Sequence, residues 1–395
     1  MIRHDVVITG IGIVSSLGEG CDAHWNALTA PDPRPVLDTE RYAPYPVHPL
    51  PEIDWTLQIP KRGDQRQMET WQRLGTYTAG LALQDAGVKD DEALVSSMDM
   101  TVAAGGGERD VPVDIDVLEA SLTRKDRDLL LNEKLTTELR PTLFLAQLSN
   151  LLAGNISIVH KVTGSSRTFM GEEGAGVSAL EHAAARIRAG QSTHALVGAA
   201  FNAEHSDMLL GYELAGYLHR GPHRTVWARD GQPGGGIVAG SGAAFLVLEA
   251  HDHARAAGRR VYAKLGPVES GRALRLGEGL QDAIAAMIAG FGLDKKTLAI
   301  SGASGAHAAT AAERTALDEP GNLVARGMST MTGHLKEAQL PFAVALAALA
   351  VHRGAAYPPF DAEAEKPWSG GAPDRILTTA IGYHRFEGAA LVEKA

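Results

Sequence analysis

The segment 174–189 (GAGVSALEHAAARIRA) constrains the fold more than any other stretch, because it is long enough for a helix and consists mainly of small residues. A strand-like run over 194–200 (HALVGAA) follows it. Before it, the pattern predicts a short helix over 148–152, a strand over 156–159 and a turn at Gly164. Together these segments predict a βαβ unit whose helix, having few large side chains, lies buried between two layers.

The same alternation of strand-like and helix-like segments runs along the whole chain. In the first part it predicts strands over 6–13, 98–104 and 242–249 and a helix over 68–86. In the second part it predicts strands near 262–265, 298–301, 376–380 and 389–392, and helices over 279–288, 308–317 and 337–350. Two successive sets of alternating elements predict an α/β fold with mostly parallel central strands.

Two stretches interrupt this rhythm. Residues 31–65 contain eight prolines and almost no periodicity, which predicts a long surface excursion. Residues 110–140 are charged and amphipathic. Long irregular segments on a regular scaffold often carry function.

Composition excludes several classes of protein. Of the 395 residues, 45% are hydrophobic and 21% charged, as in ordinary globular proteins, and the net charge of −10 argues against nucleic acid or an anionic membrane as the main partner. The single cysteine, Cys21, excludes an intramolecular disulfide and a multi-cysteine metal site and fits a reducing cytoplasm. Asp5 interrupts the apolar start of the chain, which argues against a signal peptide, and the apolar run 341–351 is about half the length of a membrane span. We therefore expect a cytoplasmic protein.

Two local motifs are weak. Gly10 and Gly12 lack the third glycine of a dinucleotide-binding loop, so a simple tight turn is the better interpretation. His251 and His253 lack companion ligands for a metal, so we expect them at a solvated helix start. We expect neither a cofactor nor a metal.

Two other positions are candidates for chemistry. The turn over 170–176 (MGEEGAG) leads into the buried helix, where free N–H groups and the helix dipole favour negative charge. Glu172 or Glu173 either caps the helix or occupies a nucleophile's position there. His334, in Thr-Gly-His before an apolar helix, is either a general acid or hydrogen-bond donor or a structural histidine.

Taken together, these pieces resemble the β-ketoacyl-acyl-carrier-protein synthases, condensing enzymes of the thiolase-like superfamily, nearly from end to end. The similar segments are VVITGIGIVSSLG (6–18), AGNISIVHKVTG (153–164), HAAARIRAGQSTHALVGAAFNAE (182–204), DGQPGGGIVAGSGAAFLVLEAHDHARAAGRRVYAKL (230–265), MTGHLKEA (331–338) and IGYHRFEGAALV (381–392). The resemblance implies a five-layered α-β-α-β-α fold with two similar halves and mixed sheets. It places the halves at 1–252 and 253–395, with insertions near 31–65 and 108–142.

The family's catalytic groups are largely replaced in this sequence. The family carries a nucleophilic Cys, two His and a Lys. Counting from the flanking motifs puts Glu173 at the Cys position, Ala303 at that of the first His and Ser329 at that of the Lys, so that only His334 is retained. His307, four residues beyond Ala303, is a poor substitute. The family's Gly-Phe-Gly-Gly gating loop reads Gly382-Tyr383-His384-Arg385 here and so lacks the flexible Gly-Gly pair.

The resemblance therefore implies a ketosynthase-like subunit of fatty acid or polyketide biosynthesis that does not condense. Its role would be that of a chain-length factor, paired as a heterodimer with a Cys-containing paralogue and serving an acyl carrier protein. The alternatives are an active 3-oxoacyl synthase or malonyl decarboxylase, and a non-catalytic acyl-binding homodimer. Family dimers bury the regions resembling 140–155 and 194–200, so the apolar run 143–146, with Phe144, is expected at the interface or acyl tunnel, where Tyr383 and His384 form the gate. Because carrier proteins are acidic, the basic residues Arg62, Arg66 and Arg73 are candidates for carrier docking.

Overall fold

The computed structural model describes residues 4–294, 297–318 and 323–395. Within them, eleven strands form one continuous mixed sheet in the order β4-β3-β5-β6-β1-β7-β11-β10-β8-β9, with the short β2 paired to β1 alone. The strands are β1 (Val6–Ser15), β2 (Gly18–Glu19), β3 (Asp99–Ala104), β4 (Ser166–Met170), β5 (His194–Phe201), β6 (Gly242–Ala250), β7 (Ala263–Gly271), β8 (Thr297–Ser301), β9 (Val324–Gly327), β10 (Arg375–Ile381) and β11 (Glu387–Glu393).

Fifteen α-helices and three short 3-10 helices lie in the described residues. They are α1 (Gly20–Leu28), η1 (Trp55–Leu57), α2 (Arg62–Gln67), α3 (Thr70–Asp85), α4 (Glu92–Ser97), α5 (Val111–Thr123), α6 (Arg127–Thr137), α7 (Leu143–Ala146), α8 (Leu151–His160), α9 (Glu173–Arg188), α10 (Ser206–Leu214), η2 (Val226–Ala228), α11 (His251–Ala256), α12 (Gly279–Gly290), α13 (His307–Asp318), α14 (Ser329–Thr332), η3 (Lys336–Ala338) and α15 (Gln339–Arg353).

The strand order repeats in the two halves. If β2 is left out and the five strands of each half are numbered in chain order, the first half has the spatial order 3-2-4-5-1, from its edge strand β4 to β1. The second half has the same spatial order, from its edge strand β9 to β7. The two first strands, β1 and β7, meet antiparallel in the middle. This repeat bears out the expectation of two similar halves, and we propose the boundary near residue 252, between β6 and β7.

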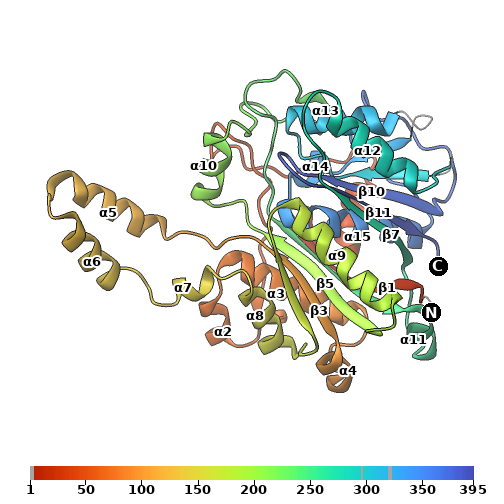
Figure 1. Ribbon diagram of the computed structural model, residues 1–395, viewed down its shortest axis with the longest axis horizontal. Coiled ribbons are helices and arrows are strands. Elements are labelled where there is room, and N and C mark those ends of the chain that lie inside the picture. The colour runs from red at the N-terminus through yellow and green to blue at the C-terminus, as the bar shows by residue number, and fades with distance from the viewer. Residues whose placement is uncertain (1–3, 295–296, 319–322) are drawn as a thin grey trace.

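Five layers result from where the helices pack. α9 and α15 lie against each other and against strands of both halves, while α3 and α8 cover the outer face of the first half and α12 and α13 that of the second (Figure 1). The thiolase-like α-β-α-β-α arrangement expected from the resemblance is therefore present.

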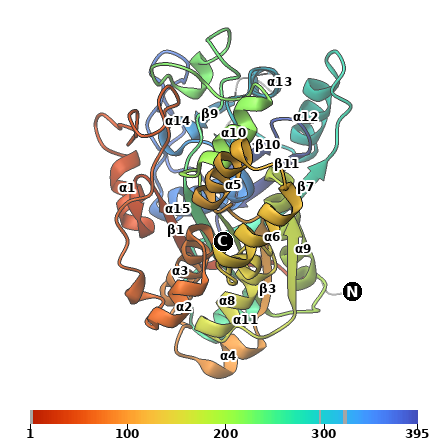
Figure 2. The same ribbon diagram turned by 90° about the vertical axis from the view of Figure 1, so that its left-hand side faces the viewer.

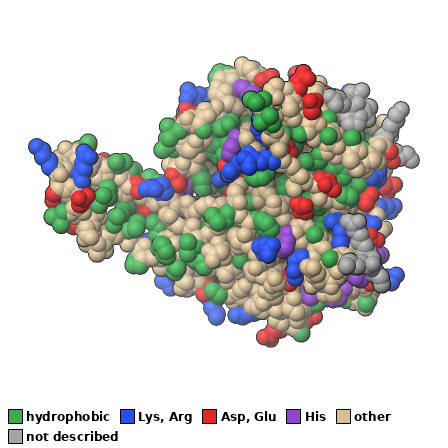
Figure 3. Space-filling model, in the orientation of Figure 1, with side chains coloured by type: hydrophobic (Ala, Val, Ile, Leu, Met, Phe, Trp, Pro, Cys, Tyr) green, Lys and Arg blue, Asp and Glu red, His purple; other side chains and the backbone are tan. Residues whose placement is uncertain are grey.

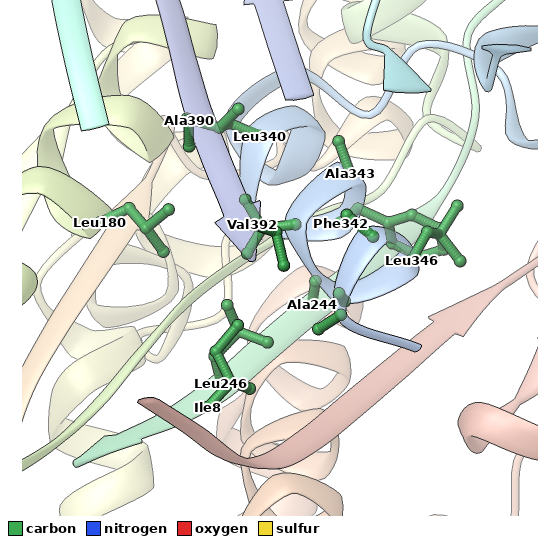
Figure 4. Packing of buried hydrophobic residues seen from close by; sticks show 14 of the residues in the cluster. Ile8, Leu180, Ala244, Leu246, Leu340, Phe342, Ala343, Leu346, Ala390 and Val392 are labelled. Carbon is green, nitrogen blue, oxygen red and sulfur yellow. The ribbon is translucent and has the colours of Figure 1, made fainter. Parts of the chain in front are cut away.

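Alternating side chains explain why both faces of the sheet are covered. On β6, Leu246 and Leu248 point into the central core with α9 and α15, whereas Phe245 and Val247 join the outer core with α3 and α8. Strands buried on both faces carry continuous apolar runs. Figure 4 shows the central core, where Leu180 of α9 and Leu340 and Phe342 of α15 lie among side chains of β1, β6 and β11.

Glycine allows close packing at two places. A Cβ atom at Gly10 or Gly12 would lie within 2.4 Å of a carbonyl oxygen of α3, and one at Gly176 would lie 2.1 Å from the carbonyl oxygen of Glu337. Gly10 and Gly12 are inside β1 rather than in the tight turn that we predicted. Because these two residues have no side chain, α3 can lie close to β1.

Several expectations from the sequence are wrong. Residues 156–159, predicted as a strand, belong to helix α8, and the strand before α9 is β4. The central strands are not mostly parallel, because β1, β6, β7 and β11 pair only antiparallel. The excursion 31–65 is not entirely at the surface, since Val47, His48 and Ile59 are fully buried.

The second insertion forms an arm. Helices α5 and α6 pack on each other and project from the body of the molecule, joined to it through α7 (Figures 1 and 2). Strand β5 is paired on both sides by β3 and β6, so the expectation that 194–200 lies at a subunit interface is wrong, and the free edge of this half is β4.

Candidate functional site

The turn between β4 and α9 places two carboxylates side by side. Gly171 adopts a φ of +145°, which L side chains rarely adopt, and so lets the chain reverse directly after the strand. Glu172 is the N-cap residue of α9 and Glu173 its first residue. The side chain of Glu173 is 1% exposed, whereas that of Glu172 remains partly accessible.

Glu173 is hydrogen-bonded to His334. The two side chains join through Nε2 of His334 and Oε1 of Glu173, 2.7 Å apart and 161 residues apart in the sequence. The backbone N–H of Tyr383 donates to the same oxygen at 3.2 Å. The backbone N–H of His334 donates to the carbonyl oxygen of Val238 at 2.8 Å, which ties the histidine to the segment that precedes β6. The sequence-predicted Glu173, His334 and Tyr383 thus form one cluster, in which Glu173 and His334 are buried and Tyr383 is half-buried.

Tyrosine rings enclose this pair. The ring of Tyr212 on α10 lies 6.1 Å from that of His334 and 5.4 Å from that of Tyr383, and Tyr217 packs against Tyr383 at 4.7 Å. Burial raises the pKa of the Tyr212 hydroxyl well above its usual range, and the nearby Glu173 carboxylate raises it further. Neither Glu173 nor His334 is open to solvent, because their side chains are at most 1% exposed.

Glu172 holds the loop that the resemblance assigns to gating. The Tyr383 hydroxyl donates to Oε1 of Glu172 at 2.6 Å. His384 Nδ1 and Arg385 Nε lie 3.3 Å and 3.5 Å from the other carboxylate oxygen. Consecutive carboxylates at the start of α9 therefore bind the loop 382–386 through its backbone, through the tyrosine hydroxyl and through two basic side chains.

The other predicted positions lie beside this cluster. Ser329 begins α14, and its hydroxyl accepts a 2.9 Å hydrogen bond from Gln339 Nε2, which also donates to the carbonyl oxygen of Gly302. Oε1 of Gln339 accepts from the backbone N–H of Leu335, next to His334. Gln339, which the sequence analysis missed, thus links the segments that carry Ala303, Ser329 and His334.

Ala303 is fully buried and brings no polar side chain to the site. Its backbone N–H donates to the hydroxyl of Ser301, which itself donates to Oε1 of Glu313 at 2.6 Å. Burial raises the pKa of Glu313 to about 7, against the lowering effect of hydrogen bonds from Ser301 and Thr379. His307 begins α13 and lines a separate cavity with Trp227 and Arg314, so it does not replace the missing histidine beside Glu173.

Cys21 does not belong to the site. It lies on α1, where burial raises the pKa of its thiol to about 12 and its sulfur lies 3.9 Å from the carbonyl oxygen of Ile11. A thiol with a raised pKa is a poor nucleophile. Among the described residues, no group of three or more His, Cys, Asp or Glu side chains is placed to hold a metal ion.

Sequence reasoning also missed Tyr212 and Glu337. Glu337 is 1% exposed, and burial raises the pKa of its carboxyl, with Glu173 and Glu172 adding to the effect. Lys336 Nζ lies 3.7 Å from its Oε1. The Lys-Glu pair two residues after His334 signalled charge at this place, but Tyr212 carried no signal because α10 is distant from the other site residues in the sequence.

Other predicted positions lie away from the cluster. Phe144 on α7 is 72% exposed, so within a single chain it lines no tunnel. Arg62 and Arg66 are exposed on α2, whereas Arg73 is half-buried on α3, with its guanidinium 5.6 Å from the centre of the Trp55 ring. Carrier docking by the exposed pair stays a prediction. No helix among the described residues is long and apolar enough to cross a membrane.

The family of the chain follows from a match over most of its length. The model of the β-ketoacyl synthase N-terminal domain matches residues 3–254, so the chain belongs to the β-ketoacyl synthase family. The 3-oxoacyl-[acyl-carrier-protein] synthase 2 of Vibrio harveyi is 26% identical over 271 residues, covering 67% of this chain and 62% of that protein. The tetracenomycin polyketide synthase ketoacyl synthase beta subunit of Streptomyces glaucescens is 28% identical over 376 residues, covering 90% of this chain and 87% of that protein.

Solved structures share the fold. The ishigamide ketosynthase/chain length factor superposes with a TM-score of 0.78 at 20% identity, covering 100% of both chains. A type II polyketide synthase complex, in which an acyl-carrier protein is bound to its ketosynthase (AntDE:AntF), gives a TM-score of 0.75 at 16% identity, again covering 100% of both chains.

Proposed function

We propose that this chain is a non-condensing, chain-length-factor-like subunit that pairs with a Cys-bearing β-ketoacyl synthase and acts with an acyl carrier protein in fatty acid or polyketide synthesis. The observation that carries the proposal is the buried hydrogen bond between Glu173 and His334. Glu173 places a carboxylate at the position that the resemblance gives to the nucleophilic thiol, and His334 is hydrogen-bonded to that carboxylate.

The chemistry of a carboxylate argues against condensation. Attack of Glu173 on a thioester would form a mixed anhydride, which hydrolyses and cannot exchange with a thiol. One carboxylate oxygen, Oε1, also accepts from His334 and from the N–H of Tyr383, and the Glu173 side chain is only 1% exposed, so the carboxylate is closed to an incoming thioester. His334 has its Nε2 bonded to Glu173, so the alternative in which this histidine supports malonyl decarboxylation has less support.

The arm supports a role in assembly. Leucines on both of its helices point into solvent, with exposed fractions of 66% at Leu118, 86% at Leu122 and 63% at Leu129. Figure 3 shows hydrophobic side chains gathered over the arm. Contiguous exposed apolar surface on a folded chain marks a surface for another protein. The ion pair of Lys134 with Asp116, at 2.7 Å, holds the two helices together without using these leucines.

Co-purification tests the proposal. A tagged copy of this chain, expressed with a Cys-bearing β-ketoacyl synthase from the same organism, is expected to form a 1:1 heterodimer in native mass spectrometry. Leu122→Glu should lower recovery of the synthase at least tenfold, whereas Leu276→Glu, a matched change at a residue 72% exposed in a loop of the second half, should not. Recovery of only homodimers or monomers would contradict the proposal, as would equal recovery with both variants.

A further inference from the structure

The loop 382–386, which joins β10 to β11, lies against the start of α9. The backbone N–H of Tyr383 donates to Oε1 of Glu173 at 3.2 Å, and a Cβ atom at Gly174 would lie 2.8 Å from Cγ of Phe386. The outer side of the loop is at the surface, since Phe386 is 38% exposed. The loop therefore has the position of a lid over the buried Glu173 carboxylate.

One arginine binds both ends of this loop. Arg275 belongs to the segment 272–278, which follows β7. Its Nη1 donates to the carbonyl oxygen of Gly382 at 2.7 Å. Its Nη2 donates to the carbonyl oxygen of Phe386 at 3.3 Å and to Oε1 of Glu387 at 2.7 Å. A single guanidinium thus connects the first and the last residue of the loop.

Glu387 keeps this arginine in place. It is the first residue of β11, and its side chain is 1% exposed. Its second oxygen, Oε2, accepts from the backbone N–H of Ala273 at 2.7 Å. Hydrogen bonds between charged groups are stronger than those between neutral ones. The strand that begins where the loop ends therefore fixes the position of Arg275.

Glu172 binds the three residues in the middle of the loop. It accepts from the Tyr383 hydroxyl at 2.6 Å, and its other oxygen lies 3.3 Å from Nδ1 of His384 and 3.5 Å from Nε of Arg385. His384 and Arg385 stand where the family has its flexible Gly-Gly pair. The substitutions that remove this flexibility thus also supply two of the side chains that Glu172 attracts.

Every residue of the loop 382–386 is therefore in contact with either Arg275 or Glu172. We propose that this loop is a latched lid, which these two residues hold closed over Glu173 and which opens only when both sets of contacts break. Loops without such contacts open frequently and exchange their amide hydrogens quickly, whereas a loop held at every residue is expected to open rarely.

Hydrogen exchange of the intact chain measures this opening. The informative amides are those of Gly382, which donates to the carbonyl oxygen of Phe386 at 2.9 Å, and of Tyr383, which donates to Glu173. Mass spectrometry with residue-level fragmentation resolves both. In the unmodified chain they are expected to exchange at least about a hundredfold more slowly than in an unstructured peptide of the same sequence. Exchange as fast as in the peptide would overturn the proposal.

Two variants each weaken one contact. Tyr383→Phe removes the hydroxyl that binds Glu172. Arg275→Lys keeps a positive charge beside Glu387 but lacks the planar fork that reaches both carbonyl oxygens of the loop. Each variant is expected to speed exchange of the two amides at least tenfold.

Two controls carry the same chemical changes on neighbouring residues. Tyr217 packs against Tyr383, and Arg272 lies over the Phe386 ring, but among the described residues neither has a hydrogen bond to the loop. Tyr217→Phe and Arg272→Lys should therefore change the exchange of both amides less than twofold. If Tyr383→Phe and Arg275→Lys were no faster than these controls, the proposal would be wrong.

The amide of Leu246, in the buried strand β6, separates opening of the lid from unfolding of the whole chain. Its exchange should be unchanged in all four variants. A parallel rise at Leu246 would assign the effect to global stability and overturn the proposal. The measurements use the purified chain and do not depend on subunit pairing, so the proposed function is tested separately.

Discussion

At the residue scale, Glu173 has a structural role that a neutral small residue cannot take. Its Oε1 is shared by His334 Nε2 and the N–H of Tyr383, and both groups lie in a region closed to water. Removing one partner of a buried polar pair leaves the other unsatisfied, which costs more than the pair itself contributes.

Glu173→Ala is therefore expected to lower the free energy of unfolding by about 3 kcal/mol, within the range seen for broken buried pairs. Glu173→Gln keeps an acceptor oxygen in the same place and should cost about 1 kcal/mol, the size of one hydrogen bond. Urea unfolding of both variants measures the difference. Equal stability of the two variants would contradict this expectation, because it would mean that an acceptor oxygen at position 173 does not contribute to the free energy of unfolding.

Glu313 is expected to make stability depend on pH. Burial raises the pKa of its carboxyl from 4.5 to about 7, so between these values the folded chain keeps a proton that the unfolded chain has released. Because the folded state binds more protons in this window, this group's contribution to stability is present below pH 4.5 and is lost as the pH rises toward 7. The loss amounts to ~3 kcal/mol at most.

Glu313→Gln removes this titration but keeps an oxygen to accept from Ser301 and Thr379. Urea unfolding at pH 5 and pH 8 should therefore show a smaller loss of stability in the variant, by about 2 kcal/mol. If the variant loses as much as the original chain over this range, Glu313 does not titrate as expected.

The resemblance, with residues counted from its flanking motifs, predicted Glu173 and His334 at catalytic positions and Tyr383 in the gate. It could not predict that Glu172 binds the loop, since the Glu172–Tyr383 bond joins residues 211 positions apart. Nor could it find Tyr212, which reaches the cluster through the packing of α10. Side-chain contacts between distant loops leave no periodic signal in the sequence.

At the scale of single elements, α9 depends on glycine where it crosses η3. A Cβ at Gly176 would lie 2.1 Å from the carbonyl oxygen of Glu337 and 3.1 Å from Cδ of Pro341. In an exposed helix, Gly→Ala stabilises by about 1 kcal/mol because alanine has the higher helix propensity. At Gly176 the steric clash outweighs this gain.

We therefore expect Gly176→Ala to destabilise the protein by about 2 kcal/mol or more, as overpacking does. Gly211→Ala in α10, where nothing lies within 4 Å of the added carbon, is the matched control and should be neutral or stabilising. Thermal unfolding compares the two. A stabilising Gly176→Ala would show that α9 and η3 are less tightly packed than the structure indicates.

Most helices and strands could be predicted because their apolar residues recur regularly over many positions. Residues 156–159, which were predicted as a strand but are helical, are an exception. Residues 156–159 contain Ile156, Ile158 and Val159, β-branched residues that favour strands. They are helical because Leu152, Ile156 and His160 recur at a spacing of four and together face α3 and the sheet. Helical periodicity over the ten residues of α8 outweighs the propensity of a short run.

At the scale of the whole molecule, the resemblance predicted the layered architecture, whereas the sequence pattern alone predicted the wrong strand directions. Parallel and antiparallel strands have similar apolar patterns when both faces are buried, so direction depends on connections that the pattern does not specify. The arm formed by α5 and α6 was apparent in sequence only as an amphipathic insertion. Its exposed leucines follow from its projection away from the core.

The exposure of Leu122 on the arm also leads to a prediction for the stability of the isolated chain. Leu122 is 86% exposed, so Leu122→Glu should change the free energy of unfolding of the purified chain by no more than about 0.5 kcal/mol while it weakens pairing. Urea unfolding of the isolated variant measures this. A large destabilisation would assign the arm to folding rather than to assembly.

The most direct test of the central claim is an elongation assay with acyl-carrier and malonyl-carrier protein, with product and carbon dioxide followed together. The chain alone should give neither elongated product nor carbon dioxide, whereas the co-purified pair with a Cys-bearing synthase should give both. Elongation by the chain alone, abolished by His334→Ala, would contradict the account.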